Sequence, residues 1–509
     1  MTNHLAAALG LDDTSRHHRQ FAAIEDGRFF TYADVDTVSA RFAAALVALG
    51  VAPGDRVAVQ VEKSIEALML YLGTLRAGGV FLPLNTAYTP AEIGFFVSDA
   101  EPALLVCDPA KAEALRPIAE GAGARLETMG VWAADREDHG SLFEHLPASA
   151  DPIMVPRAPD DLAAILYTSG TTGRSKGAML THDNLASNAR VLAEYWQFTS
   201  ADHLIHALPI YHTHGLFVAS NTTLVAGGGL IWQSRFTADG VIAALPQATA
   251  MMGVPTFYTR LLADDRLTPE RCASMRLFVA GSAPLLAETH RQWEARTGHA
   301  ILERYGMTEA SMICSNPYDD ERRAGTVGFP LPGVEIRVTD PETGAEVEQG
   351  LIGVLRVRGP NVFKGYWKLP EKTAEELSAD GWFITGDLGL IDSHGYVQIV
   401  GRGKDLIISG GFNVYPKEVE SEIDSLPGVL ESAVIGVPHP DFGEGVVAVV
   451  VKEHDAVLDA DSVIAPLADR LAKFKQPKRV IFAEALPRNT MGKVQKKALR
   501  EAHAALFEG

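Results

Sequence analysis

The segment of this sequence best suited to holding phosphate is a run rich in glycine and hydroxyl residues, Tyr167-Thr-Ser-Gly-Thr-Thr-Gly-Arg-Ser-Lys-Gly177. The backbone N–H groups and hydroxyls of such a run can close around phosphate oxygens, and Lys176 adds a point charge. The Gly-x₄-Gly-Lys-Ser/Thr spacing of a Walker A loop is absent. On composition alone, a flexible surface loop is an equally good interpretation.

Two further segments carry side chains that suit a nucleotide and a metal ion. Glu303-Arg-Tyr-Gly-Met-Thr-Glu309 follows a strand expected at 300–302, and it offers an aromatic ring for adenine, a hydroxyl for phosphate and a carboxylate for Mg²⁺. Thr385-Gly-Asp387 and Gly401-Arg-Gly-Lys-Asp405 offer a carboxylate and an arginine for the hydroxyls of a ribose. In isolation, a polar strand-to-loop turn is the favoured interpretation of the first segment, and a turn or cap residue that of Asp387.

A lysine cluster lies near the end of the chain, in Pro487-Arg-Asn-Thr-Met-Gly-Lys493-Val-Gln-Lys-Lys. Such a cluster is usually a solvated surface. The functional interpretation selects Lys493, which follows a glycine turn and could neutralise the charge that grows between a carboxylate and an α-phosphate.

Composition narrows the kind of protein. The chain has 509 residues, 47% of them hydrophobic, which predicts a folded enzyme of two or three domains. Its 45 basic and 64 acidic residues give a net charge of −19, which argues against nucleic-acid binding and requires any anion site to be locally basic. Cys107, Cys272 and Cys314 fit neither a disulfide framework nor a zinc site and are expected to be buried thiols. We find no signal peptide and no membrane-spanning run, so we expect no membrane partner and a cytoplasmic location.

The chemistry-bearing segments must be positioned by sheets and helices. Between about residues 20 and 300, short apolar runs alternate with helix-like stretches, which predicts parallel sheets covered by helices. The expected strands are Ala163–Tyr167, Leu204–Leu208, Met251–Val254 and Leu277–Ala280, and the expected helices are Leu185–Trp196, Thr256–Ala263 and Leu286–Arg296.

The remainder of the chain has a different pattern of apolar runs and turns. From about 326 to 400, short strands linked by Gly and Pro turns predict a β-rich part, with Val334–Val338, Gly353–Val357 and Tyr396–Val400 as strands. After Gly401, a helix at Glu418–Ile423 and strands at Ala433–Val437 and Val446–Val451 predict a small separate α/β domain. The predicted fold class is therefore α/β: a large N-terminal domain of two helix-covered sheets plus a β-rich subdomain, and a small mobile C-terminal α/β domain.

Taken together, in this order and at these distances, the segments resemble the superfamily of acyl-CoA synthetases, non-ribosomal peptide adenylation domains and firefly luciferase. The resemblance covers essentially the whole chain. It implies that a carboxylic acid is activated as an acyl-adenylate and transferred to coenzyme A, with ATP, Mg²⁺ and coenzyme A as the molecules bound. It also implies a large domain at 1–400, a hinge at 401–404 containing Lys404, and a small domain at 405–509.

The resemblance further implies a role for each segment. The residues it implies for ATP binding are Thr168, Ser169, Gly170, Thr171, Thr172, Gly173, Lys176, Gly281, Ser282, Ala283, Glu303, Tyr305, Gly306, Met307, Thr308, Asp387, Arg402 and Lys493. Of these, Lys493, Thr308 and Lys176 are implied in catalysis, Lys493 being the adenylation lysine and a target for a lysine acetyltransferase. Glu309 is implied as the Mg²⁺ ligand. The thioester-forming site is implied at Gly410, Gly411, Tyr415 and Lys417.

Within the superfamily, the chain is most similar to malonyl-CoA and methylmalonyl-CoA synthetases. The stretches that carry this resemblance are His206-Ala-Leu-Pro-Ile-Tyr-His-Thr-His-Gly-Leu216, Gly253-Val-Pro-Thr-Phe-Tyr-Thr-Arg260 and Glu303-Arg304-Tyr-Gly. The acyl pocket is expected between the strand ending at Pro255 and the turn at 303–307, which Arg260 and Arg304 flank. A dicarboxylate must keep its second carboxylate desolvated beside the reaction centre, and a guanidinium binds it bidentately. Ser282 and His212 complete the residues expected at the substrate carboxylate.

Several alternatives stay open at this stage. Either arginine could pair with an internal acid such as Glu303 or Asp264, and Arg235 is a weaker third candidate. Zinc binding by His212 and His214 is disfavoured, because no acidic or cysteine ligand lies at metal spacing. The acid could be another short or medium monocarboxylate, and the enzyme could instead load a carrier protein. A nucleotide-binding regulator without catalysis is disfavoured by the intact Lys493 and Glu309.

Overall fold

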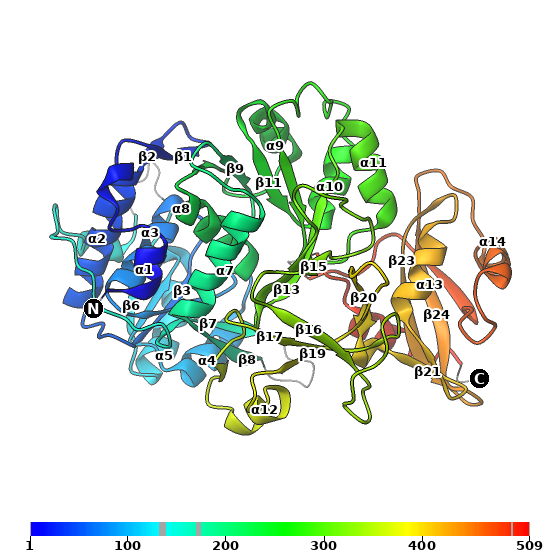
Figure 1. Cartoon of the computed structure of the whole chain (residues 1–509). Coiled ribbons are helices and arrows are strands. Elements are labelled where there is room, and N and C mark those ends of the chain that lie inside the picture. The colour runs from blue at the N-terminus through cyan, green and yellow to red at the C-terminus, as the bar shows by residue number, and fades with distance from the viewer. Residues whose placement is uncertain (1, 132–138, 169–174, 490–491, 508–509) are drawn as a thin grey trace.

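The computed structural model describes residues 2–131, 139–168, 175–489 and 492–507, and these residues form four sheets. Figure 1 shows the N-terminal sheets and their helices at the left and centre of the molecule, and the C-terminal part, in orange and red, at the right. The α/β fold class is confirmed, with two large helix-covered sheets, a small β-rich sheet and a separate C-terminal sheet.

A seven-stranded sheet forms the N-terminal half of the large part. Its central strands β7, β4, β3, β5 and β6 are parallel, and β8 and β18 add antiparallel strands at one edge. Successive residues of β3 face opposite sides, so that one side packs on α2, α3 and α7 and the other on α4 and α5. The strands, in order across the sheet, are β18 (Gly365–Tyr366), β8 (Lys176–Thr181), β7 (Leu162–Thr168), β4 (Val80–Pro83), β3 (Arg56–Gln60), β5 (Leu104–Cys107) and β6 (Arg125–Thr128).

A nine-stranded sheet forms the second half. Its central strands are parallel, and helices α9, α10 and α11 cover the face that carries Ile205, Met251 and Phe278. The opposite face packs into the core cluster shared with the first sheet. The strands, in order, are β15 (Phe329–Pro330), β14 (Ser311–Ser315), β13 (Leu302–Met307), β12 (Leu277–Ala280), β11 (Ala250–Gly253), β9 (His203–His206), β10 (Gly229–Trp232), β1 (Gln20–Ile24) and β2 (Phe29–Thr31).

Two smaller antiparallel arrangements follow along the chain. The β-rich sheet contains β16 (Glu335–Thr339), β17 (Gly353–Arg358), β19 (Phe383–Ile391) and β20 (Val397–Arg402). The C-terminal sheet contains β22 (Phe412–Val414), β21 (Ile407–Ser409), β24 (Gly443–Lys452) and β23 (Val429–His439), with β25 (Arg479–Ala483) parallel to β24.

Helices cover these sheets and begin at recognisable caps. The side chains of Thr31, Thr89 and Thr181 accept hydrogen bonds from the first turns of α2, α4 and α7, each in a capping box. The helices are α1 (His4–Ala8), α2 (Tyr32–Ala48), α3 (Ile65–Arg76), α4 (Pro90–Ala100), α5 (Ala112–Gly121), α6 (Ser141–Glu144), α7 (His182–Tyr195), α8 (Thr222–Ala226), α9 (Ala238–Ala244), α10 (Pro255–Leu262), α11 (Ala287–Thr297), α12 (Pro370–Glu376), α13 (Pro416–Asp424), α14 (Ala460–Ile464) and α15 (Lys496–Ala502).

The predicted strands and helices all exist, with ends that differ by a few residues. The strand expected at Leu277–Ala280 matches β12 at both ends, and the helix expected at Thr256–Ala263 is α10, one residue earlier. The segment after residue 302 was expected as a strand-to-loop turn, and this is wrong. Residues Leu302–Met307 form strand β13, because β14 supplies an antiparallel hydrogen-bonding partner immediately afterwards.

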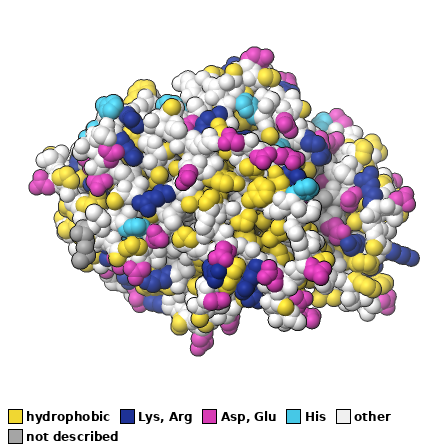
Figure 2. All heavy atoms as spheres, viewed as in Figure 1, with side chains coloured by type: hydrophobic (Ala, Val, Ile, Leu, Met, Phe, Trp, Pro, Cys, Tyr) yellow, Lys and Arg dark blue, Asp and Glu magenta, His cyan; other side chains and the backbone are white. Residues whose placement is uncertain are grey.

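The surface is mixed in charge. On the face seen in Figure 2, Lys and Arg side chains are interspersed with Asp and Glu, and apolar side chains gather near the centre, where Figure 1 labels β13 and β15. No helix of the described residues has the length and apolar character needed to span a membrane. Cys107, Cys272 and Cys314 are buried free thiols, as the sequence predicted.

The first residues of the chain are tied to α7 through a buried histidine. The Leu5 N–H, on α1, donates to Nδ1 of His182 at 3.3 Å, and His182 is fully buried. Burial, together with the nearby Arg157 charge, lowers the pKa of His182 from 6.5 to about 4. The histidine is therefore neutral in the folded protein at neutral pH.

We expect this histidine to make the fold sensitive to mild acid. Below pH 6.5 the unfolded chain takes up a proton that folded His182 refuses until about pH 4, so stability falls as the pH drops between these values. The loss from this one group is about 1.4 kcal/mol per pH unit. Urea unfolding of the wild type and of His182→Gln at pH 7 and pH 5 measures it. Equal losses of stability in the two proteins over this pH range would contradict the assignment.

Candidate active site

Strand β13 and its hairpin with β14 bring an aromatic ring and a carboxylate together. The Tyr305 hydroxyl donates to Asp387 Oδ2 at 2.5 Å, and Arg402 Nε lies 3.0 Å from Asp387 Oδ1. Asp387 on β19 and Arg402 on β20 are direct cross-strand partners, which sets this ion pair by register. Gly306 is required in the hairpin, because a Cβ there would lie 2.1 Å from the Ser311 carbonyl oxygen. The structure thus brings Tyr305, predicted for adenine, together with Asp387 and Arg402, predicted for ribose.

Thr308 and Glu309, which follow β13, are the predicted phosphate and metal contacts. Thr308 lines a small cavity with Asn85, Tyr167, Tyr211 and His212. Glu309 is buried, and its Oε1 lies 3.2 Å from the Tyr366 hydroxyl. Burial raises the pKa of Glu309, against the opposing effect of the Lys176 charge. The described residues contain no group of three or more His, Cys, Asp or Glu side chains suited to a metal, so Mg²⁺ here would take most of its oxygens from phosphate and water.

The predicted phosphate loop is only partly within the described residues. Ser169, Gly170, Thr171, Thr172 and Gly173 lie outside them. Thr168 ends β7, and Lys176 begins the paired strand β8, so the two residues are cross-strand neighbours. The Lys176 ammonium lies 3.2 Å from Glu376 Oε1 and 4.0 Å from the centre of the Tyr366 ring.

The turn after β12 is shaped by the side chain beneath it. A Cβ on Gly281 would lie 2.4 Å from Cζ of Arg304, so glycine is the residue that lets the guanidinium approach the backbone. Ser282 follows with a φ of 73°, a left-handed conformation that costs a non-glycine residue free energy. Its hydroxyl lies 3.1 Å from Nδ1 of His214. Ala283 is half-buried beside it.

Arg304 is the most unusual charge in this site. Its side chain is 3% exposed, and its Nε and Nη2 atoms are buried without a hydrogen-bond partner among the described residues. Burial lowers the pKa of the guanidinium. No described carboxylate forms an ion pair with it, and Asp264 pairs with Arg266 instead. The described residues therefore do not support the alternative in which an internal acid neutralises Arg304.

The other predicted substrate arginine has a different environment. Arg260 lies on α10 with an exposed side chain, and Arg235 is exposed as well. Glu303, next to Arg304 on β13, is buried and accepts a hydrogen bond from the Leu285 N–H at 3.2 Å. Burial raises the pKa of Glu303 to about 7. Arg304 and Arg260 thus differ sharply in burial, which the sequence did not reveal.

Two histidines approach the same region. His212 and His214 precede and begin a π-helix, His214–Asn221, a rare element that is frequent at functional sites. Burial and the Lys493 charge lower the pKa of His212 to about 4, and burial and the Arg304 charge lower that of His214 well below its usual value. Both rings are therefore neutral at pH 7, and each has a buried Nε2 that no described residue hydrogen-bonds.

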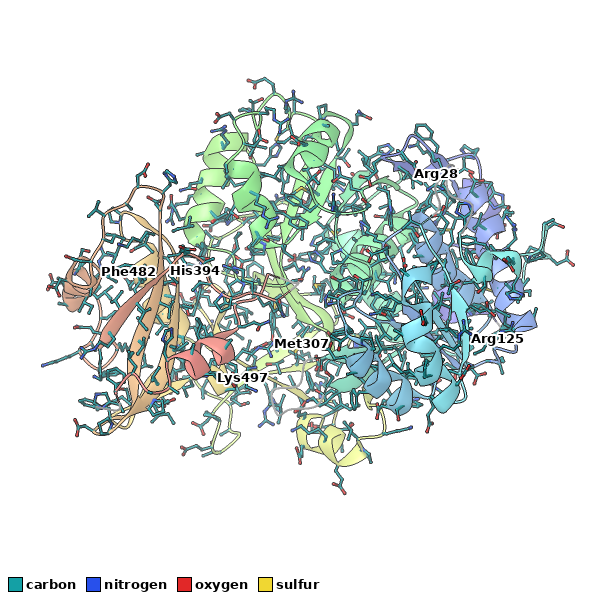
Figure 3. All side chains as sticks on the ribbon, turned by 180° about the vertical axis from the view of Figure 1, so that it is seen from behind. Arg28, Arg125, Met307, His394, Phe482 and Lys497 are labelled. Carbon is teal, nitrogen blue, oxygen red and sulfur yellow. The ribbon has the colours of Figure 1, made fainter. Side chains whose placement is uncertain are left out.

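The C-terminal lysine reaches this site in the present orientation. Gly492, with a φ of 73°, precedes Lys493, and a Cβ on Gly492 would be 3.6 Å from Thr256 at the start of α10. The Lys493 residue keeps some surface exposed to solvent. The surrounding protein and the charge of Arg402 lower the pKa of its ammonium, whereas the charges of Asp387 and Glu309 act to raise it. Figure 3 shows Met307, the last residue of β13, near the middle of the molecule, between the N-terminal sheets and the part that carries Phe482. Lys493 thus lies near residues of the nine-stranded sheet and of the β-rich sheet.

The predicted hinge and thioester residues lie between Lys404 and Lys417, in exposed turns and at the start of a helix. Lys404 is exposed in a short 3₁₀ turn, Gly403–Asp405. Gly410 and Gly411 form the tight turn of the β21–β22 hairpin, both with positive φ, and their surroundings are exposed. Tyr415 and Lys417 begin α13 and are half-buried. The roles of these residues, and the domain boundaries, stay predictions.

Two residues that contact the predicted site were not predicted from the sequence. Tyr366 contacts Glu309, which is about 60 positions away in the chain. Glu376 contacts Lys176, which is 200 positions away. Neither belongs to a pattern with a chemical signature, so no local signal could have selected them.

Comparisons with known proteins agree along the whole chain. A family model described as AMP-binding enzyme matches residues 11–367, and one described as AMP-binding enzyme C-terminal domain matches residues 418–493. The crystal structure of ATP-bound MatB from Rhodopseudomonas palustris is 58% identical, with a TM-score of 0.96 and full coverage of both chains. A malonate–CoA ligase from Arabidopsis thaliana is 36% identical over 88% of this chain and 78% of its own. A feruloyl-CoA synthase from an Amycolatopsis species is 38% identical over 93% of this chain and 94% of its own.

Proposed function

The chain belongs to the AMP-binding enzyme family, and from that membership we propose that it is an ATP-dependent malonate–CoA ligase. It activates malonate, with methylmalonate as a second candidate, as an acyl-adenylate and transfers the acyl group to coenzyme A. The products are the acyl-CoA, AMP and pyrophosphate. The observation that carries the choice of acid is the buried, unpartnered guanidinium of Arg304.

The first half-reaction depends on charge. The reacting carboxylate of malonate attacks the α-phosphorus of ATP, and negative charge grows between them. Lys493, Lys176 and Thr308 lower the energy of that state by neutralising charge and donating hydrogen bonds. Glu309 would hold Mg²⁺, which supplies further neutralisation of the phosphates. Asp387 and Arg402 are proposed for the ribose, and Gly281, Ser282, Ala283, Tyr305, Gly306 and Met307 for the adenine side.

The distal carboxylate of malonate is proposed to bind Arg304. A guanidinium binds a carboxylate with two parallel hydrogen bonds, and Nε and Nη2 of Arg304 are the two donors left without a partner. His214 and His212 are neutral and add no repulsion or competing charge. Arg260 is proposed as a weaker, solvent-facing contributor.

In the second half-reaction the thiol of coenzyme A attacks the acyl-adenylate. Lys493 has no role in this step, so the small domain is proposed to rotate about Lys404 and bring Gly410, Gly411, Tyr415 and Lys417 to the acyl group. A lysine acetyltransferase acting on Lys493 would stop the first half-reaction by removing its charge. The buried free thiols support a reducing compartment, and we propose the cytoplasm.

Lys493→Ala should stop adenylation and spare the second half-reaction. Removing one preorganised charge costs roughly 10²–10³ in rate. Pyrophosphate release with malonate measures the first half, and thioester formation from pre-made acyl-AMP measures the second. Lys497→Ala, an exposed lysine four residues on, is the control. Wild-type pyrophosphate release in Lys493→Ala would refute the assignment.

Malonate should be used far better than acetate, propionate or succinate. With acetate bound, Arg304 stays buried and unpaired, which costs about 3–5 kcal/mol, or roughly 10²–10³·⁵ in kcat/KM. Succinate is expected to be poor because one extra methylene shifts its carboxylate. A panel of acetate, propionate, malonate, methylmalonate and succinate, with ATP and coenzyme A, measures this.

The matched variant for that panel is Arg304→Met. It should lower kcat/KM for malonate by about 10²-fold, because malonate loses the charge that binds it, and should improve acetate use by a smaller factor, because acetate no longer leaves a charge unpaired. Arg235→Met, at an exposed arginine, is the control. A wild-type preference for acetate or for a long fatty acid would overturn the choice of acid and leave the ligase assignment standing.

Lys404→Pro should separate the two half-reactions. Proline fixes φ and removes a backbone donor, which restricts rotation at the hinge. We expect adenylation to persist and thioester formation to collapse, whereas Lys404→Ala should keep both. If the two half-reactions fell or survived together in Lys404→Pro, the hinge assignment would be wrong.

A further inference from the structure

An ion pair outside the predicted site holds the lysine of the phosphate loop. Lys176 Nζ lies 3.2 Å from Glu376 Oε1 and 3.3 Å from Oε2, so both carboxylate oxygens share one ammonium group. Both side chains are largely covered, at 14% exposure for Lys176 and 22% for Glu376. Surface ion pairs contribute little, but partial burial of this kind makes the geometry of a pair more persistent.

Tyr366 fixes the same two residues from a second side. Its hydroxyl donates to Glu376 Oε2 at 2.6 Å, and its ring lies 4.0 Å from the Lys176 ammonium. The hydroxyl is also 3.2 Å from Glu309 Oε1. The Tyr366 hydroxyl has one hydrogen to donate, and Glu376 is its nearer acceptor. Tyr366 therefore links the proposed metal ligand to the carboxylate that holds Lys176.

The backbone makes this arrangement rigid. Tyr366 on β18 pairs directly with Ala178 on β8, two residues after Lys176. The Tyr366 N–H donates to Thr373 Oγ1 at 2.9 Å, which anchors α12, and Glu376 is the last residue of that helix. Lys372, one turn earlier, also contacts Glu376 Oε1 at 2.9 Å. Glu376 is thus held on the same framework as the lysine it contacts.

We infer that Glu376 is a positioning residue for the ATP half-reaction, which holds the Lys176 ammonium in the direction of the ATP phosphates. The inference rests on the proposed function, because it assumes that Lys176 binds phosphate. A lysine side chain is flexible, so a free Lys176 would have to be ordered by ATP itself. An ammonium has three donors, and the carboxylate and the aromatic face leave at least one for a phosphate oxygen.

A competing possibility has the opposite sign. If Glu376 instead competed with phosphate for Lys176, ATP would have to break the Lys176–Glu376 ion pair. Removing the carboxylate would then tighten ATP binding. Positioning predicts weaker ATP binding instead. The direction of the change in KM for ATP therefore separates the two.

The test is a double-mutant cycle with Glu376→Gln and Lys176→Met, measured by pyrophosphate release with malonate. Glu376→Gln should raise KM for MgATP about tenfold, as for coupled residues in contact, and leave KM for malonate unchanged. In the Lys176→Met background, Glu376→Gln should have no further effect, because the residue acts through the lysine. Glu375→Gln is the matched control, since Glu375 is exposed on the same helix and forms an ion pair with Lys372.

The outcomes separate this inference from the function on which it rests. If Lys176→Met left KM for MgATP unchanged, the phosphate role of Lys176 would be wrong. If Lys176→Met raised KM while Glu376→Gln did not, or lowered it, only the positioning role would fall. An undiminished effect of Glu376→Gln in the Lys176→Met background would also overturn it, because the carboxylate would then act on the fold and not through the lysine.

Discussion

Arg304 costs the folded protein free energy, because its side chain is 3% exposed and two of its nitrogens find no hydrogen-bond partner in the described part of the chain. Leaving a buried charge unpaired is among the most destabilising arrangements in a protein. The surroundings are built to accommodate it: Gly281 lets the guanidinium reach the backbone, and Ser282 takes a left-handed conformation beside it. Strain and unpaired charge at one place are typical of a site that becomes satisfied when a ligand binds. An anion at this point removes the cost, whereas a monocarboxylate bound through its only carboxylate does not.

The same requirement for positive charge explains how the site is assembled. The chain has a net charge of −19, so a nucleotide and a dicarboxylate would be repelled by the protein as a whole. The cations that oppose this repulsion come from separate sheets: Lys176 starts β8, Arg304 lies on β13 and Arg402 ends β20. Lys493 arrives from the C-terminal part, whose sheet has its own core and few contacts with the rest. A charge carried on a separable part can be present for one half-reaction and absent for the next, which a charge on β13 cannot.

How far the sequence predicts this molecule depends on the range of the interactions involved. Buried strands such as β12 and amphipathic helices such as α10 follow from local periodicity, and their ends are nearly correct. The segment at 302–307 was misread as a turn because its strand character comes from pairing with β14, not from its own residues. The burial of Arg304 and the exposure of Arg260 depend on packing among β12, β13 and α10. The contact between Lys176 and Glu376 joins residues 200 positions apart, and a single sequence gives no sign of it.

The choice of acid is decided by far fewer residues than the fold. A malonate–CoA ligase and a feruloyl-CoA synthase each match 88% or more of this chain, although their names give chemically different acids. We propose that the acid contacts a small wall formed by Arg304, His214 and the turn at Ser282. A guanidinium in that wall discriminates by its cost when unpaired, and neutral histidines keep the discrimination from changing with pH near neutrality. Arginine suits this task better than lysine, since its planar fork matches a carboxylate and it stays charged when buried. Selectivity therefore depends on keeping water out of the space around Arg304, because water would satisfy the guanidinium and let a monocarboxylate bind without penalty.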